Sequence, residues 1–422
     1  MDLRDRLDWA LKTSTREKPT PEREEPGSHG EIPWGEVVQT PLGTCVRVVE
    51  EVPLHSYHGQ VSVREIFERH PRVLGSFLKS GQKEALFPDE CLFLDTETTG
   101  LAGGSGTVAF LVGLARFVDG ALQVEQFFAR DFDEEPALLH LVRQRLREYE
   151  VWVSYNGKTF DVPLLNQRLV FHRLERELLP REHIDLLYPV RRFWKNWLGE
   201  CSLARVEQQL LGVRRESDVP GWMVPGLYFR YLRERDPWPL KPVFDHNVQD
   251  VLSLVGVLNA VARLVEQPEA FVDRSEVWRA GSLLADAGRR REAVRVLERV
   301  LQNTTDARKR KRVLLQLGRL YKTLGERHRA LPLWEEASRL PGFSVEPYVE
   351  LAKYYEHHAR EVDRARQWTE RGLENLRVVQ QLFGPGHLKR EEQDLLHRLE
   401  RLHRKMGGGV KTSGASGTSP GG

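Results

Sequence analysis

The chain has 422 residues, 40% of them hydrophobic, so it is long enough to bury the cores of two or three domains. Its 63 Lys and Arg residues nearly balance 61 Asp and Glu residues, for a formal net charge of +2, which excludes a polyanion-binding protein that is basic over its whole surface. Three cysteines, Cys45, Cys91 and Cys201, do not form a disulfide framework, and we recognise neither a signal peptide nor a membrane span. We therefore expect a cytoplasmic protein.

The first 90 residues are predicted to be a lead-in and an appendage. Residues 1–35 are rich in charge and proline and poor in apolar residues, which predicts a flexible segment. Residues 36–90 contain a strand-like run at 43–52 and a short amphipathic helix at 62–70. We expect this part to form an N-terminal appendage of the domain that follows.

Strand and helix signals alternate between residues 91 and 268. Three strand-like runs come first, and the Asp119-Gly120 step between the second and the third is a hairpin signal. The predicted ranges, in chain order, are strands at 91–95, 107–117 and 122–130, a helix at 135–148, a strand at 151–156, a helix at 160–174, a strand at 183–190 and a helix at 246–267. This order predicts an α/β domain with a mixed sheet flanked by helices, similar to the ribonuclease-H-like fold.

From residue 275 to residue 405 the strand signals give way to helical segments with recurring small residues. Gly281, Gly318 and Ala352 each precede a bulky residue by three positions, and the second and third lie 34 residues apart. This period resembles that of tetratricopeptide repeats, in which small residues let neighbouring helices approach closely. We predict an all-α repeat domain here, followed by a disordered tail at 406–422.

Carboxylates occur on three predicted elements of the α/β domain. Asp95 and Glu97 lie two apart at the end of a strand, so both side chains point to one face. Asp161 begins a helix directly after a strand, and Asp250 shares a helix face with His246, four residues before it. Neighbouring carboxylates repel one another unless a cation intervenes, and hard oxygen ligands suit Mg²⁺ or Mn²⁺.

If these carboxylates converge, two divalent ions could activate a water and stabilise the leaving oxygen of a phosphodiester. His246 would then be the general base. Each residue also has a simpler explanation: Asp161 could cap its helix, and His246 could pair with Asp250. Their joint occurrence in this order favours the metal site.

Four stretches of this region resemble a known nuclease family. They are "LFLDTETTGLAGGSGTVAFLVGLARF", "SYNGKTFDVPLL", "DVPGWMVPGLYFRYL" and "HNVQDVLSL". They resemble the DEDD exonuclease superfamily and, within it, the YprB-type ribonuclease-H-like exonuclease domain, which is often followed by tetratricopeptide repeats. The resemblance covers residues 36–265 and implies two-metal 3′→5′ hydrolysis of nucleic acid with Asp95, Glu97, Asp161 and Asp250 as ligands. One departure concerns His246, which stands at the spacing of the family's tyrosine branch and leaves the identity of the base open.

Further residues are candidates for substrate contacts. Thr98, Asn156 and Lys158 flank the predicted ligands and are expected to bind a terminal nucleotide, and Gly100–Gly106 is expected to form a tight turn near the substrate. Residues 191–215 interleave arginines and Lys195 with aromatic residues, among them Phe193, Trp194 and Trp197. This composition fits phosphate contacts with base stacking, and it fits equally well a helix with an apolar core face and a solvated basic face.

These observations lead to three functional hypotheses. The first is a metal-dependent 3′→5′ exonuclease that binds a single-stranded end of DNA or RNA, with helical repeats that bind a partner protein or extend the substrate path. The second is a catalytically idle nuclease-like scaffold, and the third is a structure-selective endonuclease on the same fold.

Overall fold

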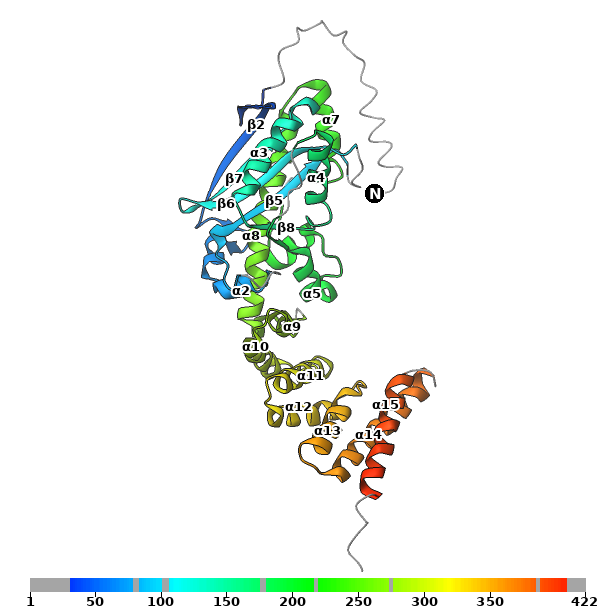
Figure 1. Ribbon diagram of the computed structural model, residues 1–422. Helices are drawn as coiled ribbons and strands as arrows, with labels where there is room; N and C mark the ends of the chain where they lie inside the picture. The colour runs from blue at the N-terminus through cyan, green and yellow to red at the C-terminus, as the bar shows by residue number, and fades with distance from the viewer. Residues whose placement is uncertain are drawn as a thin grey trace, which may run out of the picture.

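The computed structural model describes most of the chain (Figure 1). The described ranges are 31–78, 83–100, 106–174, 180–215, 219–272, 276–384 and 388–407. The predicted flexible ends therefore fall almost entirely outside the described residues, as do positions 101–105 of the predicted tight turn. Figure 1 shows an α/β body from which a series of helices leads away to the C-terminus.

The α/β body is built on a mixed seven-stranded sheet, as predicted, with the strand order β1-β2-β7-β6-β5-β8-β9. Strands β5, β8 and β9 run parallel, and the remaining neighbours pair antiparallel. Because β2 pairs with β7, the range expected to form an appendage supplies two strands of the sheet itself. The strands are β1 Glu36–Thr40, β2 Gly43–Pro53, β5 Cys91–Thr98, β6 Ala109–Val118, β7 Ala121–Phe128, β8 Val151–Ser154 and β9 Glu182–Asp185, and a separate hairpin joins β3 Tyr57–His58 to β4 Val61–Ser62.

Two sequence signals can be compared directly with the backbone. Asp119 and Gly120 have φ of 50° and 77°, and Val118 pairs with Ala121, which is the two-residue hairpin that the Asp-Gly step predicts. The strand predicted at 183–190 is wrong beyond Asp185. The Asp185 carboxylate accepts a hydrogen bond from the Leu187 amide (3.1 Å), and helix α5 starts at Leu187.

Alternate residues of β5 pack against different helices, as the two-residue period requires. Leu92 and Leu94 face α3 (Glu135–Arg147) and α4 (Asp161–Phe171), whereas Cys91 and Phe93 face α8 (Lys241–Glu266). The segment Trp238–Glu266 is long enough to span a membrane and contains an 18-residue window with a mean hydropathy of 1.5, but 83% of that window is buried within the protein. Its hydrophobicity is therefore that of a core helix.

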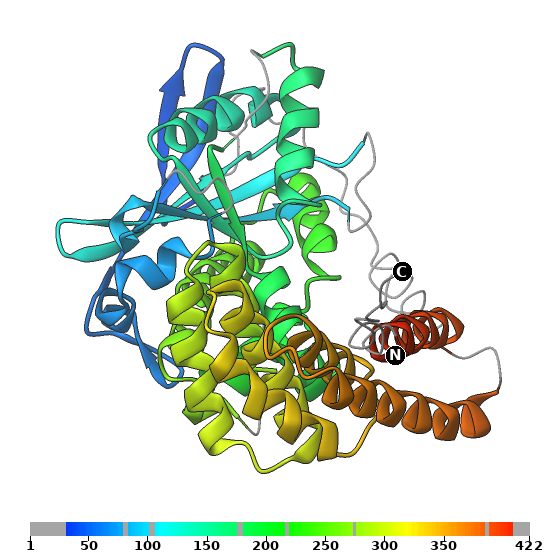
Figure 2. The ribbon, with the colours of Figure 1, turned by 60° about the horizontal axis from the view of Figure 1, so that its bottom comes forward.

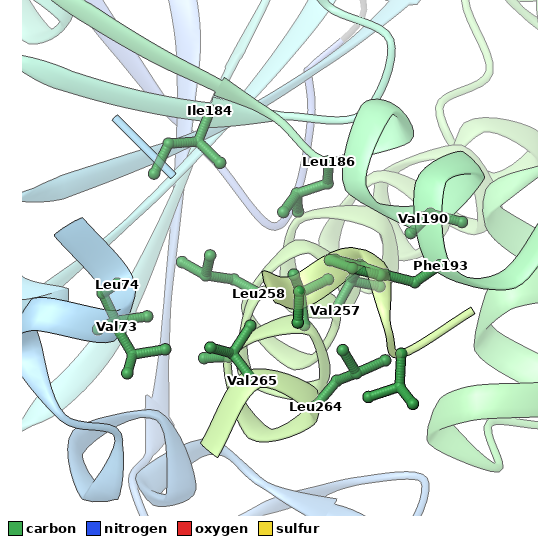
Figure 3. Packing of buried hydrophobic residues seen from close by; sticks show 14 of the residues in the cluster. Val73, Leu74, Ile184, Leu186, Val190, Phe193, Val257, Leu258, Leu264 and Val265 are labelled. Atoms are coloured by element: carbon green, nitrogen blue, oxygen red, sulfur yellow. The ribbon is translucent and has the colours of Figure 1, made fainter. Parts of the chain in front are cut away.

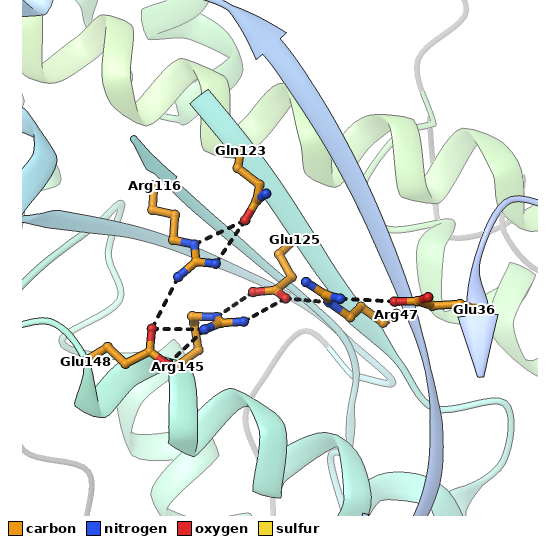
Figure 4. Close-up of polar contacts among 7 residues, drawn as sticks. All are labelled: Glu36, Arg47, Arg116, Gln123, Glu125, Arg145 and Glu148. Carbon is orange, nitrogen blue, oxygen red and sulfur yellow. Dashed lines mark hydrogen bonds and ion pairs between the residues drawn. The ribbon is translucent and has the colours of Figure 1, made fainter. Parts of the chain in front are cut away.

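A buried carboxylate joins α3 to the N-terminal strands (Figure 4). Glu125 on β7 is 1% exposed and accepts hydrogen bonds from Arg47 on β2 (2.5 Å) and Arg145 on α3 (2.6 Å). Burial alone would raise the pKa of Glu125, but the hydrogen bonds from the two arginines lower it below its usual value. The two ion pairs with Glu125 therefore hold both β2 and α3 against β7.

The C-terminal region consists of helices that lead away from the sheet (Figure 2). A methyl group added at Gly281 of α9 would lie 2.5 Å from Leu297 of α10, and one at Gly318 of α11 would overlap Trp334 of α12. The small residues of the predicted repeats therefore lie where paired helices approach closely, while the assignment to tetratricopeptide repeats stays a prediction.

The apolar core is continuous from the sheet, through α8 and α5, into the first helices of this region. Figure 3 shows the part of this core where Ile184 of β9, Phe193 of α5 and Leu258 of α8 lie. The remaining helices are α2 Pro71–Gly75, α5 Leu187–Leu198, α6 Leu203–Val206, α7 Val224–Glu234, α9 Arg279–Asp286, α10 Arg290–Asn303, α11 Ala307–Thr323, α12 Arg327–Arg339, α13 Glu346–His357, α14 Val362–Phe383 and α15 Lys389–Gly407. Short 3₁₀ helices lie at η1 Val63–Glu68, η2 Pro88–Glu90, η3 Phe132–Glu134, η5 Trp238–Leu240 and η6 Pro268–Phe271, and η4 Glu207–Leu211 is a π-helix. The helix predicted at 62–70 is the 3₁₀ turn η1.

Candidate active site

Asp95 and Glu97 point from β5 toward α8. The parallel pairing of Phe93 with Val153 puts Asp95 just past the end of β8, where the sheet leaves room for side chains. Asp95 accepts a hydrogen bond from Asn247 of α8, and a Glu97 oxygen lies 3.9 Å from Nε2 of His246, also on α8. The shared face predicted for the two carboxylates is thus the face that α8 covers.

Asp95 is held in place by Asn247, which lies over a row of three residues on neighbouring strands. Asp95 pairs with Gly113 on β6, which pairs with Gln126 on β7. Asn247, which is fully buried, lies over this row: its Nδ2 donates to Asp95 Oδ2 (2.9 Å), and its Oδ1 accepts from Gln126 Nε2 (2.9 Å). A Cβ atom at Gly113 would overlap the Asn247 amide, so only glycine leaves this space. Asn247 was not predicted from the sequence; the signal was a glycine in the middle of an apolar strand.

Asp161 reaches the site from the other face of β5. Its Oδ1 accepts a hydrogen bond from Thr96 Oγ1 (2.5 Å). The preceding loop is held by Asp185, which is 3% exposed and accepts hydrogen bonds from the backbone amides of Asn156 (2.9 Å) and Lys158 (3.1 Å). Burial, with the charges of Asp185 and Asp250, raises the pKa of Asp161 to about 6 despite the bond from Thr96.

The four predicted carboxylates converge. Burial, followed by the charges of Asp250, Glu97 and Asp161, raises the pKa of Asp95 well above its usual value. Ligand atoms of Glu97, His246 and Asp250 all lie within 4.8 Å of one another. The carboxylate oxygens of Glu97 and Asp250 in this set fit a divalent cation, which would relieve the repulsion among the carboxylates.

Arg215 also enters this site, although the sequence analysis placed it only in the basic stretch 191–215, as a phosphate contact or part of a solvated basic face. Its guanidinium donates to Asp250 Oδ1 and to Glu207 Oε1 (2.5 Å), and it contacts Nδ1 of His246 (3.0 Å). Glu207 is 2% exposed and accepts a further hydrogen bond from Ser253 (2.5 Å). Arg215 is thus anchored on one side by a buried carboxylate and holds Asp250 on the other.

The contact with Arg215 fixes the tautomer of His246. A guanidinium only donates, so Nδ1 of His246 accepts, and a neutral ring carries its proton on Nε2. Nε2 lies 3.4 Å from Asp250 Oδ2. In this arrangement His246 presents an N–H, rather than a lone pair, to the carboxylates.

Comparison with known proteins agrees with this architecture. Residues 92–262 match the family model of the RNase_H superfamily. The uncharacterized protein YprB of Bacillus subtilis (strain 168) is 34% identical over 376 residues, which cover 86% of each chain. The chain belongs to the YprB family. Among solved structures, the family B DNA polymerase of the archaeon Pyrobaculum calidifontis has 16% sequence identity and a TM-score of 0.35, and the match covers 57% of the YprB-family chain and 30% of the polymerase.

The predicted substrate residues of this YprB-family protein lie in two environments. Thr98 is buried, and its hydroxyl donates to the carbonyl of Gly100 (2.8 Å). Asn156 is exposed, with a left-handed φ of 66°, and its side chain accepts a hydrogen bond from Thr159 (2.5 Å). Lys158 Nζ lies 5.8 Å from the centre of the Tyr188 ring. Asn156 and Lys158 thus belong to the loop that precedes Asp161. Thr98 is instead buried at the end of β5, and its hydroxyl is bonded within the protein.

The aromatic residues of the predicted basic stretch divide between core and surface. Phe193 and Trp194 are fully buried in the core of the YprB-family protein, so base stacking by these two residues is excluded. Trp197 is 36% exposed. Tyr188, which was not singled out from the sequence, is 54% exposed at the start of the same helix.

Proposed function

We propose that this YprB-family protein is a metal-dependent nuclease, acting as a 3′→5′ exonuclease on DNA or RNA. The observation that carries the proposal is the convergence of four carboxylates, Asp95 and Glu97 of β5, Asp161 of α4 and Asp250 of α8, whose charges help to raise the pKa of the half-buried Asp95. Membership of the ribonuclease H superfamily supports the nuclease class. The exonuclease polarity comes from the family resemblance of the motifs.

Asp95, Glu97, Asp161 and Asp250 would hold two Mg²⁺ or Mn²⁺ ions. Such ions supply an activated water and stabilise the leaving oxygen of a phosphodiester. Asn247 orients Asp95, while Arg215 holds one oxygen of Asp250 and leaves the other directed to the site. These contacts fix two of the carboxylates before substrate binds.

His246 is the proposed general base for the attacking water. In the tautomer fixed by Arg215 its Nε2 carries a proton, so it cannot accept one there. The base role therefore requires that the ring leave Arg215 and turn an unprotonated nitrogen toward the water.

Two alternatives remain open to test. A catalytically idle scaffold is disfavoured because all four acidic positions are filled. A structure-selective endonuclease would use the same carboxylates, but it would also cut a substrate whose ends are blocked.

The experiment uses 5′-labelled single-stranded DNA, single-stranded RNA and duplex, each with a free or a blocked 3′ end, in Mg²⁺, Mn²⁺ or EDTA. Asp95→Asn and Asp161→Asn are compared with Asp245→Asn, an exposed carboxylate on the same helix as Asp250 that pairs with Lys241. We expect a metal-dependent ladder that the first two variants and the blocked 3′ end abolish, and that the control retains. Cleavage of blocked substrates would favour the endonuclease, and no cleavage of any substrate would favour the scaffold.

A further inference from the structure

Helix α5 leads away from the candidate active site with one face in the core and one face in solvent. It begins two residues after Asp185, the residue that holds the loop of Asp161. Its buried face is formed by apolar residues that include Phe193 and Trp194. On the other side Tyr188, Arg191 and Lys195 follow one another at i, i+3 and i+7, so they share one face, called here the α5 stripe.

The α5 stripe is exposed and positively charged. Tyr188 is 54% exposed, and Arg191 and Lys195 are exposed as well. Within the described parts of the chain, no carboxylate forms an ion pair with Arg191 or Lys195, whereas nearby Arg181 pairs with Glu150. An aromatic ring and two cations therefore face solvent together on one helix.

The α5 stripe is connected to the active site by Lys158. The Lys158 ammonium group lies 5.8 Å from the centre of the Tyr188 ring. The Lys158 backbone amide, three residues before Asp161, donates a hydrogen bond to the Asp185 carboxylate (3.1 Å). Since the helix rises about 1.5 Å per residue, Lys195 lies roughly 10 Å beyond Tyr188 along the axis. The positive charges thus continue outward from the site.

A cleft of about 890 Å³ runs beside Tyr188 and is lined by α5, by the segment that contains α2 and by the first helices of the C-terminal region. Lys158, Asp185 and Arg192 line one wall, and Leu283 and Arg289 line the other. Arg192 lies 3.7 Å from Asp286 and Arg289 is paired with Glu292, so the charges of the cleft are largely balanced. The excess positive charge lies on the α5 stripe at its edge.

We propose that the α5 stripe binds the single strand of nucleic acid whose end lies at the carboxylates. This inference rests on the proposed nuclease function, because it places the strand by reference to that site. Arg191 and Lys195 contact phosphates, and the face of Tyr188 stacks on a base. The strand is single because only an unpaired base offers its face to an exposed ring.

The binding test uses the full chain in EDTA with a fluorescein-labelled 20-nucleotide strand of DNA or RNA, followed by anisotropy over a series of salt concentrations. We expect Tyr188→Ala to weaken binding about 5- to 150-fold, the range typical of one base stacked on one aromatic side chain. We expect Arg191→Gln/Lys195→Gln to reduce the slope of log K against log salt by about 0.7 for each phosphate that the variant no longer neutralises. Duplex of the same length should bind more weakly than the single strand.

The controls remove one exposed tyrosine or two exposed positive charges elsewhere on the surface. Tyr57→Ala removes a tyrosine that is 73% exposed on β3, and Arg147→Gln/Arg233→Gln removes two exposed arginines of α3 and α7. Binding by the control variants should match that of the wild type. If the α5 variants bind single strands as the controls do, with an unchanged salt slope, the inference is overturned.

A second substrate separates this inference from the proposed function. A short chromogenic diester, the p-nitrophenyl ester of thymidine 5′-monophosphate, reaches only the carboxylates, so the α5 variants should lose more activity on the 20-nucleotide strand than on the diester. Equal losses on both substrates would show that the variants disturb the active site and would contradict the α5 stripe as strand path. An inactive wild type would overturn the proposed function alone, and the anisotropy measurement would still decide the inference.

Discussion

The closest packing beside the candidate active site is that of Asn247 over Gly113, and it makes a defined prediction for Gly113→Ala. The added methyl group would overlap the buried amide of Asn247. If the Asn247 amide keeps its position, the core is overpacked. If the amide moves, Asp95 loses the hydrogen bond from Asn247. In both cases the substitution should destabilise the protein and lower its activity.

The expected losses of stability and of activity can be worked out from these two outcomes. Overpacking a core costs about 1–3 kcal/mol, and losing a hydrogen bond to a charged group costs about 1.5–3 kcal/mol. Alanine recovers about 0.5–1 kcal/mol of backbone entropy relative to glycine in a strand, so the net loss should be about 1–2 kcal/mol. If Asp95 is misplaced, the same hydrogen-bond energy corresponds to a roughly ten- to hundredfold loss of hydrolysis rate, at about 1.36 kcal/mol per factor of ten.

Urea unfolding followed by tryptophan fluorescence measures the stability, and metal-dependent hydrolysis measures the activity. Gly226→Ala on α7 is the matched control, since a methyl group there meets nothing within 4 Å. In a background of Asn247→Ala, which empties the space above Gly113, the cost of Gly113→Ala should largely disappear. An equal cost in both backgrounds would refute the packing argument.

Three further predictions concern the rest of the site. Burial, with the charge of Arg215, lowers the pKa of His58 from 6.5 to about 4, so the folded protein binds fewer protons than the unfolded chain between these values, and up to about 3 kcal/mol of stability should be lost as pH falls from 6.5 to 4. His58→Gln should flatten this slope in urea midpoints measured between pH 4 and pH 7, and an unchanged slope would assign it to other groups. Arg215→Ala leaves Glu207 buried without its cation and should cost about 3–5 kcal/mol in urea unfolding, part of which Glu207→Gln should restore in the double variant; equal stability of the single and double variants would count against this pairing. Mg²⁺ or Mn²⁺ at about 100 times its Kd should stabilise the wild type by about 2.7 kcal/mol, and Asp250→Asn should reduce this gain; a melting temperature that is the same in metal and in EDTA would argue against a metal site.

Local geometry accounts for the parts of the site that could be predicted from the sequence. The two-residue period of a strand places Asp95 and Glu97 on one face, and the four-residue spacing of a helix does the same for His246 and Asp250. These relations hold within one element, so the rest of the fold does not change them. The same is true of the Asp119-Gly120 turn.

The parts that could not be predicted depend on contacts between distant segments. Arg215 reaches Asp250 from a loop 35 residues earlier, and Asn247 bridges Asp95 and Gln126, which are 152 and 121 residues away. Composition alone could not separate the buried Trp194 from the exposed Tyr188, because the two lie six residues apart on one helix whose faces are fixed by packing. The burial and the partners of such residues are decided by contacts between segments that are far apart in the chain, and one sequence alone does not show these contacts.

The continuity of the core through α8 bears on how this protein can be divided. The last turns of α8, with Leu264 and Val265, pack in one cluster with Ala280 and Leu284 of α9, and the amide of Glu276 donates to the carbonyl of Phe193 on α5 (2.6 Å). A polypeptide ending after α8 would turn this apolar seam toward water and would remove the contact of Glu276 with α5. The α/β half is therefore completed by the helices that follow it, and a shortened chain that keeps only the candidate site would need a new polar surface designed along that seam before it could stand alone.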